Sequence, residues 1–95
     1  MGPRKAAIHF REKYPEAASY KVKLYGSLAA TGKGHQTDKA LMDELSPKEV
    51  AIEWYPEILL PEHPNGLEFI AVDENKNEYS AWKVFSIGGG KITDF

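Results

Sequence analysis

The chain has 95 residues, 27% charged residues, 12% aromatic residues and a formal net charge of −2, as expected for one globular domain rather than two. It contains no cysteine, which excludes a disulfide framework, cysteine catalysis and a thiolate metal site within this chain. The small net charge and scattered basic residues predict no nucleic-acid partner, and the lack of a long apolar run predicts no membrane span or secretory signal. We therefore expect a cytoplasmic protein.

The first predicted element is a helix that starts at Pro3 and ends at Pro15. Pro3 suits the first turn, where its missing N–H would have no partner. Ala7, Phe10 and Tyr14 recur at helical spacing and predict a buried face, whereas His9 is expected at the surface. A helix so close to residue 1 suggests that sequence is missing upstream.

The middle of the chain alternates between strand and helix patterns. Residues 20–24 alternate apolar residues with lysines, which predicts a half-buried strand with a solvated lysine face. A small-residue segment follows over 26–34, and a second helix is predicted from 36 or 37 to the stop at Ser46-Pro47. Residues 50–54 alternate again and predict a second strand.

The last third predicts a β-hairpin. After a proline-rich connection, residues 67–72 and 78–87 read as strands joined by the polar turn 73–77. The run Gly88-Gly89-Gly90 breaks the chain before a short strand within 92–95. This order predicts an α+β fold: a small, largely antiparallel sheet with the helices packed on one face.

The segment from Leu24 to His35 is the first candidate for chemistry. It leads from a strand end to a helix start, where free backbone N–H groups and the helix dipole favour a carboxylate or phosphate. Hydroxyls, an amine and an imidazole accompany these N–H groups, and the candidate residues are Ser27, Thr31, Gly32, Lys33, Gly34 and His35. A phosphate-binding P-loop fails on spacing, since five residues separate Gly26 from Gly32 and glycine follows Lys33. A plain strand–turn–helix connection remains the alternative.

The second candidate segment is the loop from Leu60 to Gly66. His63 lies between two prolines that hold it stiffly, and Asn65-Gly66 is a strong turn signal that could by itself explain the segment. The three histidines of the chain show no metal-ligand spacing, so no metal site is predicted.

Together these segments resemble the beta domain of the iron–sulfur-dependent L-serine dehydratases. The matching pieces are residues 2–7, 24–38, 60–66 and 85–90, in the family's order and approximate spacing. The resemblance spans nearly the whole chain, residues 1–95, as a domain incomplete at its N-terminus and without the catalytic alpha domain. It departs from the family in lacking the Gly-Pro-Ser-Ser-Ser-His-Thr segment before Gly2, in having Gln36 where many relatives have glycine, and in a shorter stretch between Asp38 and His63.

The resemblance implies an enzyme activity, the conversion of L-serine to pyruvate and ammonia. A 4Fe–4S cluster bound by cysteines of the absent alpha domain would act as Lewis acid, and none would bind in this chain. His35 matches the histidine proposed to remove the α-proton, and the polar loop from Ser27 to Gly34 would help to hold the substrate. The implied partners are L-serine, the iron–sulfur alpha domain in the same chain or a separate subunit, and a second copy in a homodimer.

Two alternatives stay open at the level of sequence. The same fold resembles the allosteric substrate-binding domain of some phosphoglycerate dehydrogenases, in which case Lys33, His63 and Asn65 would contact serine or an anion as effector. A purely structural module would instead use Trp54 and Trp82 as interface anchors, although their alternation with other residues favours the core.

Overall fold

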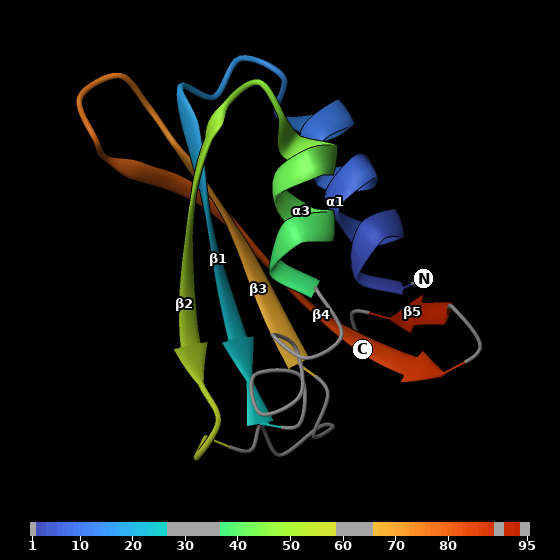
Figure 1. Cartoon of the computed structure of the whole chain (residues 1–95). Helices are drawn as coiled ribbons and strands as arrows, with labels where there is room; N and C mark the ends of the chain where they lie inside the picture. Colours follow the sequence, from blue (N-terminus) through green and yellow to red (C-terminus); the bar gives the residue numbers. More distant parts are fainter. Residues whose placement is uncertain (1, 27–36, 59–65, 89–90, 94–95) are drawn as a thin grey trace.

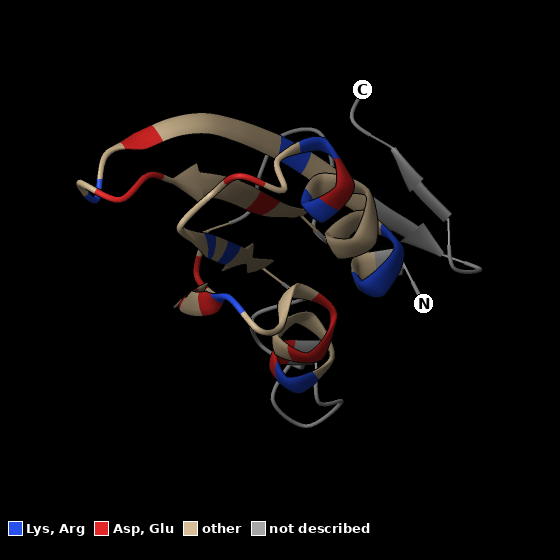
Figure 2. Ribbon diagram, turned by 90° about the horizontal axis from the view of Figure 1, so that it is seen from above, with Lys and Arg blue, Asp and Glu red and all other residues tan. Residues whose placement is uncertain are grey.

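The computed structural model describes residues 2–26, 37–58, 66–88 and 91–93. These residues form the helices α1 (Gly2–Lys13) and α3 (Thr37–Leu45) and five strands. The strands are β1 (Ser19–Tyr25), β2 (Glu49–Tyr55), β3 (Gly66–Val72), β4 (Glu78–Gly88) and β5 (Lys91–Thr93). Both helices lie side by side on one face of the sheet (Figures 1 and 2). The α+β prediction with helices on one face is therefore confirmed.

The sheet has the strand order β2-β1-β3-β4-β5 and is mixed. Strand β1 pairs in parallel with β2, while the β1–β3, β3–β4 and β4–β5 pairs are antiparallel. The parallel pair arises because α3 carries the chain back across the sheet between β1 and β2, as a crossover between parallel strands requires. The sheet is thus largely antiparallel, with one parallel pair at one side.

The core lies between the sheet and the two helices. Tyr20, Val22 and Leu24 alternate along β1 with half-exposed lysines, and all three point toward the helices. Phe10 of α1 is 1% exposed and stacks on Phe69 of β3 at 5.5 Å between ring centroids. Leu41 and Leu45 bring α3 onto the same cluster. Met42, the residue after Leu41, is exposed.

Trp54 and Trp82 are half-buried and pack against this core on the side of the sheet that the helices cover. Both side chains lie on the same face of the sheet as the core residues, because Trp54 is the register partner of Leu24 and Trp82 is that of Phe69. The preference for core over interface anchors is therefore confirmed. His9 is exposed, as predicted, and its ring lies 5.1 Å from that of Trp82.

One end of the sheet is closed by short turns that are tied together. Asp73 accepts hydrogen bonds from the backbone N–H groups of Asn75 and Asn77 at 2.9 Å, which forms the predicted hairpin turn. Lys48, just before β2, donates to the carbonyls of Pro15 and Ala17, just before β1. The turns preceding the two parallel strands are thereby joined. The opposite end of the sheet carries the long connections.

Candidate functional site

The long connections all attach at one end of the sheet, which we call the exit end and define by Tyr25, Tyr55, Gly66 and Phe85. These four residues form one row across the strands, because Tyr25 pairs with Tyr55, Leu24 with Leu67, and Gly66 with Phe85. Strands β1 and β2 leave the sheet there, and β3 enters it there. Strand β4 also runs out past this row, to Gly88. Helix α3 begins near the same end (Figure 1).

This arrangement brings together the ends of the segments singled out in the sequence. The candidate residues Ser27, Thr31, Gly32, Lys33, Gly34 and His35 lie between β1 and α3, outside the described residues. His63 and Asn65 lie between β2 and β3 and are also outside them. The anchors of both connections nevertheless meet at the exit end. The resemblance segments 24–38, 60–66 and 85–90 all reach this one end of the molecule.

Gly26 is the last described residue before the first candidate connection, and its backbone explains why a glycine stands there. It is buried and has a φ angle of 52°, in the left-handed region that residues with a Cβ atom occupy only at a cost. The backbone therefore turns sharply out of β1 at this point. At the other anchor, Asp38 lies in the first turn of α3, where a carboxylate is stabilised by the helix dipole.

The described side chains at the exit end add hydroxyl donors that sequence reasoning missed. The rings of Tyr25 and Tyr55 stack at 5.6 Å between centroids on the open face of the sheet. The Tyr55 hydroxyl donates to Glu53 at 2.7 Å, and this hydrogen bond raises the pKa of Tyr55. Burial raises the pKa of Tyr25, with Glu68 adding to the effect. Both phenols therefore ionise less readily than a free tyrosine side chain. The register of β1 against β2, which pairs them, could not be read from either strand alone.

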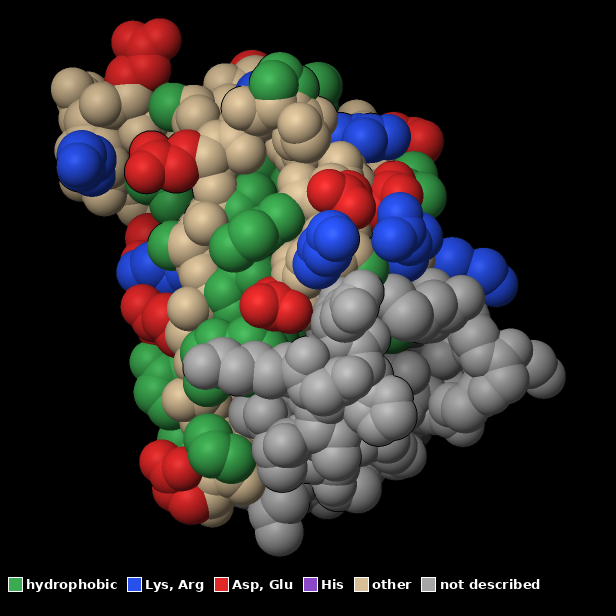
Figure 3. Space-filling model, in the orientation of Figure 1, with side chains coloured by type: hydrophobic (Ala, Val, Ile, Leu, Met, Phe, Trp, Pro, Cys, Tyr) green, Lys and Arg blue, Asp and Glu red, His purple; other side chains and the backbone are tan. Residues whose placement is uncertain are grey.

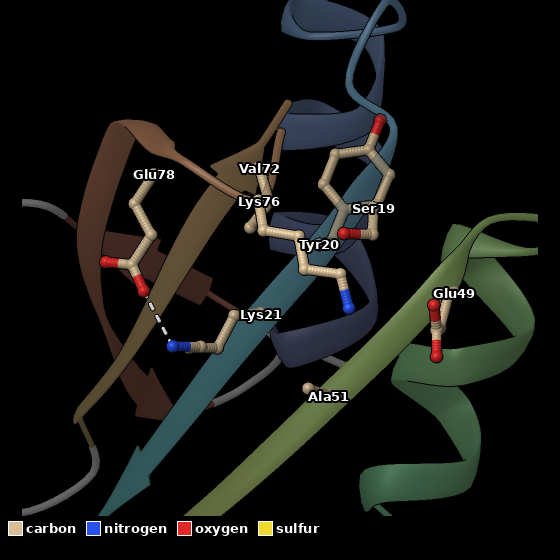
Figure 4. Close-up of a pocket in the computed structure, with 8 residues that line it drawn as sticks. All are labelled: Ser19, Tyr20, Lys21, Glu49, Ala51, Val72, Lys76 and Glu78. Atoms are coloured by element: carbon tan, nitrogen blue, oxygen red, sulfur yellow. Dashed lines mark hydrogen bonds and ion pairs between the residues drawn. The ribbon is translucent and has the colours of Figure 1, made fainter. Parts of the chain in front are cut away.

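A hollow of about 330 Å³ lies at the far end of the open sheet face, away from the exit end. Figure 4 shows Lys21 turned toward Glu78, with an N–O distance of 2.6 Å, while Glu49 stands apart on β2. The hollow is lined by residues 19–21, 49, 51, 72, 76 and 78. None of these residues belongs to a segment that resembles the serine dehydratase family. The hollow is therefore not the predicted site.

The described residues do not fit an iron–sulfur cluster. Such clusters are held by cysteine thiolates, and the chain has no cysteine. Within residues 2–26, 37–58, 66–88 and 91–93, no group of three or more His, Cys, Asp or Glu side chains could hold a metal ion. If a cluster takes part in the reaction, its ligands have to come from another domain.

On the face shown in Figure 3, the described surface carries no large area of one sign of charge. In Figure 3, acidic and basic side chains alternate along the visible margin of the molecule. In the part of the chain that the structure covers, neither helix is both long and apolar enough to span a bilayer.

The positive φ angle of Gly26 leads to a testable prediction. We expect Gly26→Ala to lower the free energy of unfolding by about 1–2 kcal/mol, the cost of placing an L-residue in the left-handed region. The measurement is urea denaturation followed by circular dichroism. The matched control is a synthetic chain with D-alanine at this position, which adds a methyl group of the same size on the other side of Cα and favours positive φ. Equal losses in the two chains would show that crowding, not backbone geometry, selects glycine.

Comparison with known proteins identifies the family. The family model described as "Serine dehydratase beta chain" matches residues 1–58 and 44–95. The L-serine dehydratase of Mycobacterium bovis is 30% identical over 97% of this chain, and that of Haemophilus influenzae is 28% identical over 99%. A protein of Bacillus subtilis named "Probable L-serine dehydratase, beta chain" is 35% identical over 75% of the chain.

The matches also show what the chain leaves out. It spans 29% of the Mycobacterium bovis protein and 39% of the Bacillus subtilis beta chain. The alignments run over 132 to 135 positions although the chain has 95 residues, so those relatives carry internal segments without a counterpart here. The regulatory alternative gains no support, because each of these matches is to a serine dehydratase. The chain belongs to the serine dehydratase beta chain family.

Proposed function

We propose that this chain supplies the beta domain of an L-serine dehydratase, which converts L-serine to pyruvate and ammonia together with an iron–sulfur partner domain in the cytoplasm. The observation that carries the proposal is the convergence at the exit end. Three segments of the family pattern, far apart in the sequence, have their ends in one region of the fold. Short turns would be enough to connect these strands if the connections served the fold alone. The long connections gathered at one end therefore favour a further role for that end.

In this proposal the connection after Gly26 holds the substrate. Backbone N–H groups of the loop and the hydroxyls of Ser27 and Thr31 would bind the serine carboxylate, assisted by the ammonium of Lys33. The left-handed Gly26 sets the direction in which this connection leaves β1. The helix that follows adds its positive end to the same region.

His35 is the proposed general base. A neutral imidazole accepts the α-proton of L-serine, and the imidazolium gives this proton to the departing hydroxyl, so that water and aminoacrylate form. Aminoacrylate becomes an imine, and water then releases ammonia to leave pyruvate. The reaction consumes one serine and gives one pyruvate and one ammonium ion, with no external oxidant or reductant. The partner domain would contribute the cluster and a homodimer would form in the complete enzyme, both on the strength of the family resemblance.

The test is reconstitution with a cysteine-bearing alpha domain of this family, prepared as a separate alpha chain. We expect anaerobically purified alpha chain and this chain to form pyruvate from L-serine together, whereas each alone forms little or none. Pyruvate is measured with a coupled reductase assay, and a cluster cysteine of the alpha chain replaced by serine is the control. A stable, cluster-loaded complex that produces no pyruvate would contradict the proposal.

A further inference from the structure

The open face of the sheet, opposite the helices, carries a row of four charged side chains that we call the charge row. It consists of Glu53 on β2, Lys23 on β1, Glu68 on β3 and Lys83 on β4. Each is the direct register partner of the next, so the row crosses four strands at one level. Lys23 alternates along β1 with the buried Val22 and Leu24, whose side chains face the helices. The side chains of Lys23 and of its register partners therefore lie on the face without helices.

The two lysines of the charge row have unused capacity for ion pairing. Lys21, one level away, takes up the nearby carboxylates, at 2.6 Å from Glu78 and 3.8 Å from Glu53. Among the described residues, neither Lys23 nor Lys83 forms an ion pair. Both nevertheless stand beside Glu68 in the register. The row therefore presents alternating charges outward from the sheet.

The order of the signs makes the charge row complementary to itself. Consider a second copy placed face to face by a two-fold axis that runs along the strands between β1 and β3. The axis reverses the order of the row, so Glu53 faces Lys83 of the other copy and Lys23 faces its Glu68. All four contacts then join opposite charges. An axis running across the strands instead would place each charge opposite its own copy, so the row selects one orientation.

The neighbouring level holds Ala51, Lys21, Ile70 and Ala81 in register order. Ala51 and Ala81 are small and exposed at its two ends, Ile70 is 3% exposed, and Lys21 is turned toward Glu78. Strands of about seven residues spaced about 4.8 Å apart give a four-stranded face on the order of 400 Å² per copy. This places the contact among small, weak interfaces, in which charge pattern rather than buried area determines which surfaces meet.

We propose that the open sheet face pairs with the same face of a second copy of this chain, oriented by the charge row. The inference rests on the homodimer included in the proposed function and names its surface. It is independent of the chemistry assigned to His35, because the charge row lies on the sheet itself and outside the connection after Gly26.

Charge swapping provides the test, using the 95-residue chain in low salt. The molar mass is measured by sedimentation equilibrium from about 10 μM to about 1 mM, the range in which weak pairs associate. We expect the wild type to dimerise, and Lys23→Glu and Glu68→Lys each to remain monomeric, since like charges then face each other. An equimolar mixture of these two variants should form a one-to-one dimer, because every facing pair becomes opposite in sign. The double variant should also dimerise.

Lys39→Glu, on the exposed side of α3, is the matched control and should dimerise like the wild type. If an inner variant does not fold, Glu53→Lys and Lys83→Glu provide the same test with the outer pair. A monomeric wild type at about 1 mM, or a mixture that stays monomeric, would overturn the proposal. A second result would also overturn it: the wild type is monomeric, and Lys23→Glu weakens binding to the alpha chain. The open sheet face would then be assigned to contact with the alpha chain. Pyruvate formation in the reconstituted complex is a separate readout, so either proposal can fail alone.

Discussion

Replacing His35 with alanine is expected to lower the turnover of the reconstituted complex by about 10²- to 10⁴-fold, the usual contribution of a positioned general base. The proton at the α-carbon of serine would then have no acceptor, while binding of the substrate carboxylate by the loop would persist. We therefore expect the loss in kcat rather than in KM. The measurement is the rate of pyruvate formation at saturating L-serine under anaerobic conditions.

Two comparisons separate a base from a structural role for His35. His9→Ala removes an exposed histidine of α1 and should leave the turnover within about twofold, since surface changes away from the reacting groups have small effects. Added imidazole should restore part of the activity of His35→Ala and not that of His9→Ala. Unchanged turnover in a folded, complexed His35→Ala protein would assign the proton transfer to another group.

Phe10→Ala should have the largest effect on stability, lowering the free energy of unfolding by about 3–5 kcal/mol. The Phe10 ring is 1% exposed and lies within 6.4 Å of four other aromatic rings, measured between centroids. These are the rings of Tyr14, Tyr20, Phe69 and Trp82, so the substitution leaves a cavity bordered by the residue after α1 and by strands β1, β3 and β4. Urea denaturation followed by circular dichroism measures the change.

Met42→Ala is the control for this experiment, because Met42 is an apolar side chain of α3 that is 45% exposed. Its loss should cost less than about 1 kcal/mol, as expected away from the core. A domain of this size has a total stability on the order of 5–15 kcal/mol, so Phe10→Ala is expected to leave the fold marginal. A loss below about 1 kcal/mol for Phe10→Ala would mean that the helix does not depend on this ring for its position.

Local patterns in the sequence were sufficient for most elements of the fold. Alternation along residues 20–24 predicted both the buried side of β1 and its lysine face, because side chains of a strand point to opposite sides in turn. The polar turn 73–77 was predicted for a similarly local reason, since Asp73 bonds to its own neighbours. The structure places β4 over Glu78–Gly88 and β5 over Lys91–Thr93, within a few residues of the predicted limits.

Features that depend on contacts between distant segments could not be predicted. Nothing in Glu49–Tyr55 reveals that it runs parallel to β1 at the side of the sheet, because that pairing is set by the crossover through α3. The stacking of Tyr25 on Tyr55 and the charge row follow from this register and were equally hidden. The site residues after Gly26 were singled out as a small, polar loop between a strand and a helix, and the family resemblance added the roles that we propose for them.

The separation of long connections from short turns has a practical consequence for attaching reporters. The β3–β4 turn around Lys76 lies at the opposite end of the strands from Tyr25 and Phe85, and its residues are exposed. Lys76 already has a φ angle of 67°, and its backbone N–H bonds only within the turn, to Asp73. A fluorophore or affinity peptide introduced there would stand clear of the exit end, which makes this turn the natural point for immobilising the chain.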